Sequence, residues 1–90
     1  MKIALISSCE NFDYKKIISP NCTKIITNIT NLENVIQNVP IEYETDIDNL
    51  IKNADWVMVI YDKKHKKLPA VISKCKNYHI SVEFINADVF

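Results

Sequence analysis

The strict alternation of two hydrophobic periods along the chain constrains its fold most. Five short segments rich in β-branched and aromatic residues are typical of strands, and each is separated from the next by a stretch whose apolar residues recur at helical spacing. Strands and helices that alternate in this way form a parallel sheet, because each helix returns the chain to the end of the sheet where the previous strand began. The sequence therefore predicts a single α/β domain over residues 1–90.

The expected elements follow from this periodicity. Strands are predicted at 2–7, 23–27, 41–44, 54–62 and 80–85. Asp13 and Asp46 are candidate N-caps of two short helices, and 68–78 is predicted to be a longer helix with Pro69 in its first turn. Asn31 is the candidate N-cap of a further helix, whose apolar face consists of Leu32, Val35, Ile36 and Val39.

The pattern within the strands predicts their order in the sheet. Segments 2–7 and 54–62 are apolar on both sides, whereas 41–44 and 80–85 alternate between apolar and polar residues. The first pair belongs inside the sheet and the second at its edges. We predict a three-layer, doubly wound, Rossmann-like fold with five parallel strands in the order 3-2-1-4-5 and helices on both faces.

Composition argues against several classes of function. All eleven basic residues are lysine and the formal net charge is zero, which argues against binding to nucleic acid. The longest apolar runs are far shorter than a membrane span, and no basic and apolar leader precedes Ile3, so we expect a cytoplasmic protein without membrane association. Cys9, Cys22 and Cys75 form no close pair, which predicts reduced thiols and no metal site. No cofactor is predicted.

A candidate binding site lies where the first and fourth strands end. In a doubly wound sheet the chain leaves these strands in opposite directions, and a crevice opens beyond their carboxyl ends. Hydroxyl groups, main-chain amides and lysine side chains gathered there favour an anion such as a phosphate group. The residues predicted to contribute are Ser7, Ser8, Cys9, Glu10, Thr27, Asn28, Asp62, Lys63 and Lys64. The alternative is that these residues only cap helices and form a solvated loop.

Four stretches of the sequence resemble one known family. They are "KIALISSCENFDYKKI" (2–17), "TKIITNITNLENVI" (23–36), "VPIEYETDIDNLIKNADWVMVIYD" (39–62) and "ISVEFI" (80–85). Together they resemble the small Rossmann-like domains of the SLOG superfamily, in its YspA-like branch. The resemblance covers nearly the whole chain in order. It implies a nucleotide-derived ligand, which members of this family hold in loops after the first, second and fourth strands.

The resemblance assigns residues of this chain to those loops. Residues 7–9 (Ser-Ser-Cys) stand at the family's Gly-Ser-Arg positions, and residues 12–14 (Phe-Asp-Tyr) match its aromatic-Asp-Tyr turn. Residues 28–29 (Asn-Ile) occupy its Gly-Gly pair. Asp62 matches the aspartate of the fourth loop, but Lys63 follows it where the family has glycine.

Two binding positions, Ser8 and Asp62, keep the family's residue type. The chain contains no glycine at all. A glycine of a phosphate loop leaves room for the ligand and adopts positive φ without strain, whereas the β-branched Ile29 does neither. We therefore expect the second loop to bind no phosphate.

Two functions remain open from the sequence. The first, which we favour, is a non-catalytic domain that has lost the family's nucleotide loops and acts through protein interaction, as a homodimer or another homo-oligomer. The second is a ligand-sensing module that binds a nucleotide or other phosphorylated metabolite beyond the first and fourth strands. Cys9 is an alternative candidate nucleophile, but the adjacent Glu10 would raise its thiol pKa, so no catalytic residue is predicted.

Overall fold

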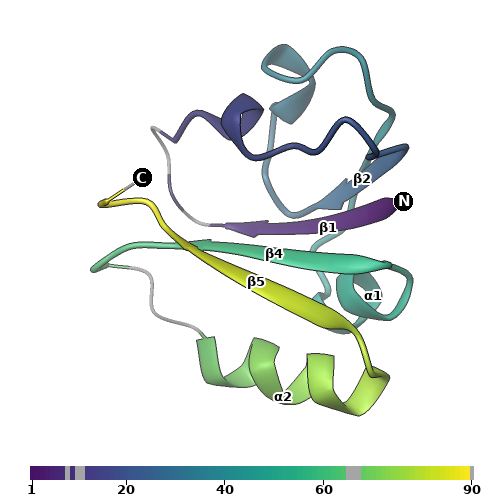
Figure 1. The fold of residues 1–90 in the computed structure, drawn as a ribbon, viewed down its shortest axis with the longest axis vertical. Coiled ribbons are helices and arrows are strands. Elements are labelled where there is room, and N and C mark those ends of the chain that lie inside the picture. Colours follow the sequence, from purple (N-terminus) through teal and green to yellow (C-terminus); the bar gives the residue numbers. More distant parts are fainter. Residues whose placement is uncertain (8, 10–11, 65–67, 90) are drawn as a thin grey trace.

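A computed structural model describes residues 1–7, 9, 12–64 and 68–89, with the backbone alone for residues 68 and 69. Its centre is one sheet of five parallel strands (Figure 1). The strands are β1 (Lys2–Ser7), β2 (Lys24–Thr27), β3 (Ile41–Tyr43), β4 (Trp56–Tyr61) and β5 (Ser81–Asn86), and their order is β3-β2-β1-β4-β5. The predicted order is confirmed, with β3 and β5 at the two edges.

The central strand is apolar because both of its faces are covered. β1 pairs with β2 on one side and with β4 on the other, so that Ala4 lies in register with both Ile26 and Val57. Ala4 and Val57 are fully buried and Ile26 is 1% exposed. In the edge strand β5, by contrast, exposed Ser81 and Glu83 alternate with partly buried residues. The burial pattern explains why the hydrophobic pattern predicted the strand order.

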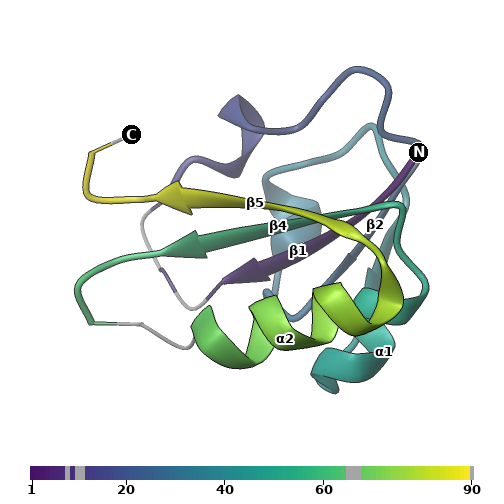
Figure 2. The same ribbon diagram turned by 60° about the horizontal axis from the view of Figure 1, so that its bottom comes forward.

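One face of the sheet, here called the helix face, is covered by two α-helices. These are α1 (Ile47–Lys52) and α2 (Leu68–Tyr78), which pack against each other below the sheet in Figure 2. The core on this face joins residues of both helices, such as Leu50 and Cys75, to strand residues such as Val57. None of the described helices is long and apolar enough to cross a lipid bilayer.

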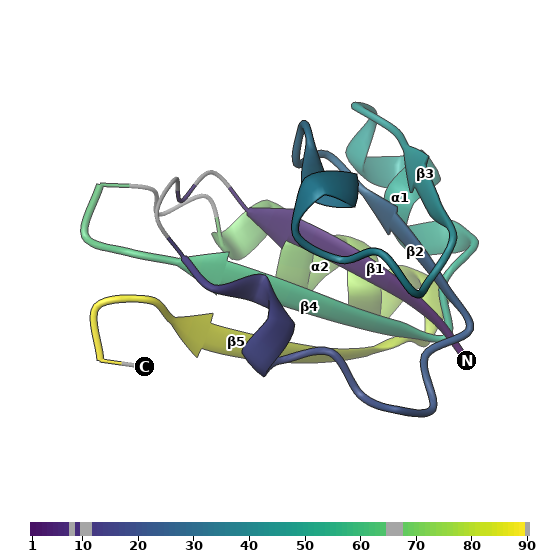
Figure 3. The same ribbon diagram turned by 90° about the horizontal axis from the view of Figure 1, so that it is seen from above.

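The opposite face, here called the turn face, is covered by irregular chain with two single-turn 3₁₀-helices. They are η1 (Tyr14–Lys16) and η2 (Leu32–Asn34) (Figure 3). Tyr14 and Leu32 are buried there against strand residues that include Ile3. Helices thus lie on both faces, but the helix predicted to carry Leu32, Val35, Ile36 and Val39 is wrong beyond its first turn.

Two of the three predicted N-caps make a capping hydrogen bond. Asp13 accepts a hydrogen bond from the Lys15 amide at 3.2 Å, and Asp46 accepts one from the Asp48 amide at 2.9 Å, so both predicted caps are confirmed. Asn31 precedes η2 in a left-handed conformation, with φ at 60°, and its side chain makes no capping hydrogen bond. Asn31 thus precedes η2 without capping it. The missing cap does not account for the single turn, because η1 is capped by Asp13 and has the same three residues.

Candidate functional site

The turns that follow β1 and β4 meet at the carboxyl edge of the sheet. The two strands are hydrogen-bonded neighbours. Beyond them, the Cys9 thiol donates a hydrogen bond to the Asp62 carboxylate at 3.5 Å and lies 3.9 Å from the Ile60 carbonyl oxygen. Candidate residues separated by 53 positions in the sequence are therefore in contact.

Ser7, Cys9 and Tyr14 form a closed hydrogen-bond network at the end of β1. The Cys9 amide donates to the Ser7 hydroxyl oxygen at 3.0 Å, and the Tyr14 hydroxyl oxygen lies 2.9 Å from that same atom. The Tyr14 hydroxyl also donates to the Cys9 carbonyl oxygen at 2.7 Å. All three residues are at most 9% exposed. These described polar groups of the first loop thus already have partners within the protein.

The side chains of Thr27 and Asn28, at the end of β2, are also hydrogen-bonded within the protein. The fully buried Thr27 hydroxyl donates to the Leu5 carbonyl oxygen at 2.8 Å and accepts from the Ile29 amide at 3.0 Å. The Asn28 side-chain oxygen accepts from the Ser7 amide at 3.1 Å. In a phosphate site such amides point at the ligand, whereas here a side-chain oxygen accepts their hydrogens.

The second loop also lacks the left-handed backbone of a glycine pair. Among the described residues, positive φ values occur only at Asn31 (60°) and His79 (56°). Asn28 and Ile29, which occupy the predicted Gly-Gly positions, have ordinary backbone conformations. The loop therefore follows a different path, and the absence of glycine imposes no strain at these two positions.

The loop after β4 is closed by two carboxylates. The Asp62 side chain accepts from the Lys64 amide at 2.9 Å, and Asp88, in the turn after β5, accepts from the Lys63 amide at 3.2 Å. Lys63 and Lys64 are both exposed. Carboxylate oxygens therefore occupy the positions from which a bound anion would accept these amide hydrogens.

The environment of Cys9 disfavours nucleophilic chemistry. Burial raises the pKa of its thiol, a hydrogen bond with Ser7 acts in the opposite direction, and the Asp62 carboxylate raises the pKa further. Burial likewise raises the pKa of the Tyr14 hydroxyl. At neutral pH both groups stay protonated, and the thiolate is the reactive form of cysteine.

The described residues of this edge bury no unpaired polar side chain that could aim at a ligand. No buried side-chain nitrogen or oxygen among them lacks a hydrogen-bond partner. In that same part of the chain, no three His, Cys, Asp or Glu side chains gather as metal ligands would.

A hollow of about 520 Å³ nevertheless opens at the carboxyl ends of β1 and β2. Ser7, Cys9 and Asn28, three of the predicted site residues, contribute to its wall, and Thr30 and Asn34 add polar side chains. This hollow lies toward β2, to the side of the crevice expected between β1 and β4. Its remaining lining residues come mainly from η2 and the segment before it.

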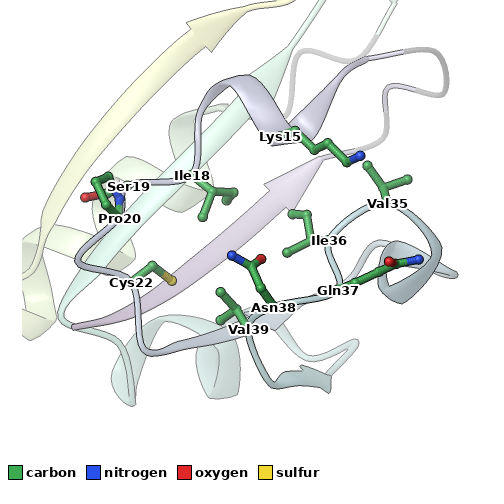
Figure 4. A pocket seen from close by; sticks show the side chains of 10 residues that line it. All are labelled: Lys15, Ile18, Ser19, Pro20, Cys22, Val35, Ile36, Gln37, Asn38 and Val39. Carbon is green, nitrogen blue, oxygen red and sulfur yellow. The ribbon is translucent and has the colours of Figure 1, made fainter.

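A second hollow, of about 560 Å³, lies on the turn face between the segments that follow η1 and η2. Figure 4 shows Ile18, Ile36 and Val39 around it, with the amide of Asn38 turned toward its interior. It lies between the segment that joins β1 to β2 and the segment that joins β2 to β3. Longer helices in these segments would fill this space. We therefore attribute it to the shortness of η1 and η2.

The predicted site residues divide into three groups. Ser7, Cys9, Asn28 and Asp62 are joined to one another by the hydrogen bonds described above, whereas Thr27 bonds to Leu5 and Ile29 instead. Lys63 and Lys64 contribute their amides. Ser8 and Glu10 lie outside the described residues, so the site is described without them.

Two residues important to this edge were not predicted as site residues, namely Tyr14 and Asp88. Tyr14 was identified only as part of a turn motif. Asp88 follows β5, and β5 neighbours β4 in the predicted strand order. The sequence therefore indicated that the Asp88 carboxylate could reach the loop after β4, where it accepts from the Lys63 amide.

Comparison with known proteins gives no match. No protein-family model matches the chain, and no significant match was found among curated proteins or solved structures.

Proposed function

We propose that this domain is a degenerate relative of the SLOG superfamily that acts through contacts with other protein chains and binds no nucleotide. The observation that carries the proposal is the internal hydrogen bonding of the carboxyl edge. Among the described residues of these loops, five main-chain amides that could bind a phosphate are bonded to side chains of the same domain; they belong to Ser7, Cys9, Ile29, Lys63 and Lys64.

Displacing these internal partners would cost free energy that a ligand must recover. The buried Cys9 amide, freed from its acceptor, loses a hydrogen bond at a cost of about 1–3 kcal/mol until a ligand replaces it. The exposed amides of Lys63 and Lys64 can bond to water and cost less. A phosphate would also approach the carboxylates of Asp62 and Asp88, which repel it. The site therefore favours the unliganded domain.

The cysteines support a cytoplasmic location for this function. Cys9, Cys22 and Cys75 are all unpaired and buried. Unpaired thiols are usual in proteins of the reducing cytoplasm, where disulfides are rare.

A ligand titration tests the proposal. Thermal unfolding should show no rise in Tm with millimolar inorganic phosphate, nucleotides or sugar phosphates. A concentration-dependent rise that is lost in Lys63→Ala or Lys64→Ala, and kept in the control Lys52→Ala on exposed α1 surface, would overturn it.

The second candidate function is a ligand-sensing module for a nucleotide or other phosphorylated metabolite. It is favoured by the contact between the loops after β1 and β4, by the exposed Lys63 and Lys64, and by the hollow beside Asn28. The same titration separates the two functions. A ligand held in that hollow would lose affinity in Asn34→Ala, a change at an exposed residue that leaves the internal hydrogen bonds intact.

A further inference from the structure

The two edges of the sheet differ in how well they are protected from pairing with another strand. β3 has three residues, follows Pro40, and carries Glu42 in an ion pair with Lys24 at 3.0 Å. β5 has six residues and contains neither proline nor lysine. Natural edge strands are kept from association by shortness, proline and charged side chains, especially lysine. β5 has only the exposed Glu83 among these features, so it is the less protected edge.

The main chain of β5 has hydrogen-bonding groups that point away from the sheet. The Ala87 amide donates to the Tyr61 carbonyl oxygen at 2.8 Å, so Ala87 faces β4. Because main-chain groups alternate in direction along a strand, Val82, Phe84 and Asn86 face outward. Within the described residues, no partner bonds the main-chain groups of Val82 or Phe84. We call these three residues the β5 edge.

A hollow lies directly beside this edge on the helix face. It measures about 390 Å³, is situated between α2 and β5, and is lined by apolar Ile72, Ile80 and Val82 together with Lys76. In a doubly wound sheet, one more βα unit would place a strand against β5 and a helix beside α2. The described domain has neither, so the edge and the hollow are uncovered together.

We propose that the β5 edge pairs in antiparallel fashion with the β5 edge of a second copy of this chain, a step that rests on the proposed function. The two-fold axis is perpendicular to the sheet, so each face of the sheet continues into the same face of the second copy. The second α2 then lies beside the first, next to the hollow. One partner thus supplies both the strand and the helix that the edge lacks, in a self-complementary interface.

Charge excludes one register of this pairing, and we propose the neighbouring one. With Phe84 on the two-fold axis, Val82, Phe84 and Asn86 each meet an outward-facing residue, which gives about four main-chain hydrogen bonds between free groups. Two more would go to the Asn86 carbonyl oxygens, each of which already accepts from the Val89 amide of its own chain at 3.3 Å. Glu83 then lies opposite Ile85 of the second copy. With Glu83 on the axis, the Glu83 residues of the two copies would lie directly opposite each other, with Cα atoms about 4.5 Å apart. Their two carboxylates would repel each other.

Two exposed apolar residues also come together in this arrangement. Trp56 is in register with Ser81 at the start of β5 and is 37% exposed, whereas Val89, just after the end of β5, is 81% exposed. Antiparallel pairing puts the end of one β5 beside the start of the other. Val89 of each copy is thereby brought to the neighbourhood of Trp56 of the second copy, where both can lose contact with water.

Sedimentation of matched proline variants tests the interface. The wild type should sediment as a dimer at micromolar concentration and dissociate on dilution, with a red shift in the emission of Trp56, the single tryptophan. Val82→Pro removes an outward amide and no bond of the sheet, so it should fold and sediment as a monomer. Tyr43→Pro is the control on the other edge strand, β3. The Glu44 amide bonds to β2, so the neighbouring Tyr43 amide points outward, and this variant should remain dimeric.

Cross-linking tests the register independently of proline. Phe84→Cys places two cysteines opposite each other on the axis, with Cα atoms about 5.5 Å apart, and should form an intermolecular disulfide under mild oxidation. In Glu83→Cys the Cα atoms of the two new cysteines would lie more than about 7 Å apart, so this variant should form no intermolecular disulfide.

A monomeric wild type at high micromolar concentration, a dimeric Val82→Pro, or a faster cross-link in Glu83→Cys than in Phe84→Cys would each overturn the proposed dimer. If Val82→Pro fails to fold, as judged by circular dichroism, the cysteine pair decides the question. The ligand titration is read separately, so loss of this interface is distinguishable from failure of the proposed function.

Discussion

The two faces of the sheet reach the same burial by different means. On the helix face Leu50, a residue of α1, is completely buried, and on the turn face Leu32, a residue of the single 3₁₀ turn η2, is 1% exposed. The helices satisfy their own main-chain groups, whereas the turn face depends on side chains such as Ser7 and Tyr14. The comparison shows that apolar covering alone does not require helices, but irregular covering requires specific polar side chains.

The largest expected effect comes from removing core volume on each face. Leu50→Ala should lower the free energy of unfolding by about 3–5 kcal/mol, because regular helices collapse poorly into a cavity. Leu32→Ala should cost about 2–3 kcal/mol, because irregular chain can relax toward the space left. Urea denaturation of both variants measures the difference. A larger loss for Leu32→Ala would show that the turn face is the more rigid of the two.

The next effect concerns the polar side chains of the turn face. Tyr14→Phe removes the hydroxyl that contacts Ser7 and donates to the buried Cys9 carbonyl, and should cost about 1–2 kcal/mol. Tyr78→Phe, on the exposed surface of α2, is the matched control and should change stability by less than about 0.5 kcal/mol. Equal stability of the two variants would contradict the structural role given to the network.

Alkaline pH should weaken the turn face before the helix face. Burial raises the pKa of Cys9, Cys22 and Tyr14 on the turn face, but only that of Cys75 in the core of the helix face. A raised folded-state pKa gives stability that is complete below the unfolded-state value and is lost as pH rises through the folded-state value. Tm should therefore fall above about pH 9.

Hydrogen exchange can locate this loss. Amides around Tyr14 and Leu32 should lose protection at a lower pH than amides of α2. Simultaneous loss on both faces would instead indicate that the domain opens as one unit.

The smallest effect is expected for an exposed ion pair on the helix face. Lys74 of α2 contacts Asp48 of α1 at 2.7 Å, and this hydrogen bond raises the pKa of Lys74. Both side chains remain substantially exposed to solvent, which screens the pair. Asp48→Asn should leave Tm almost unchanged, and a loss as large as that of Tyr14→Phe would mean that the two helices depend on this link.

The sequence by itself determined the sheet. Apolar residues on both sides of 2–7 and 54–62, and alternation in 80–85, reflect local burial that depends only on whether a strand is inside the sheet or at its edge. Helix 68–78 and the caps Asp13 and Asp46 were predicted for the same reason, since their signals lie within one or two turns of chain.

Only the tertiary structure decided the length of η2 and the fate of the carboxyl edge. The spacing of Leu32, Val35 and Ile36 fits a helix. In the structure Asn31 adopts a left-handed conformation, and Leu32 is buried although the segment forms only one 3₁₀ turn. The pairing of the Lys63 amide with Asp88, and of the Ser7 amide with Asn28, joins residues far apart in sequence. Such hydrogen bonds depend on the positions that the loops take in space. The predicted strand order indicates which loops are neighbours, but not which amide and side chain meet.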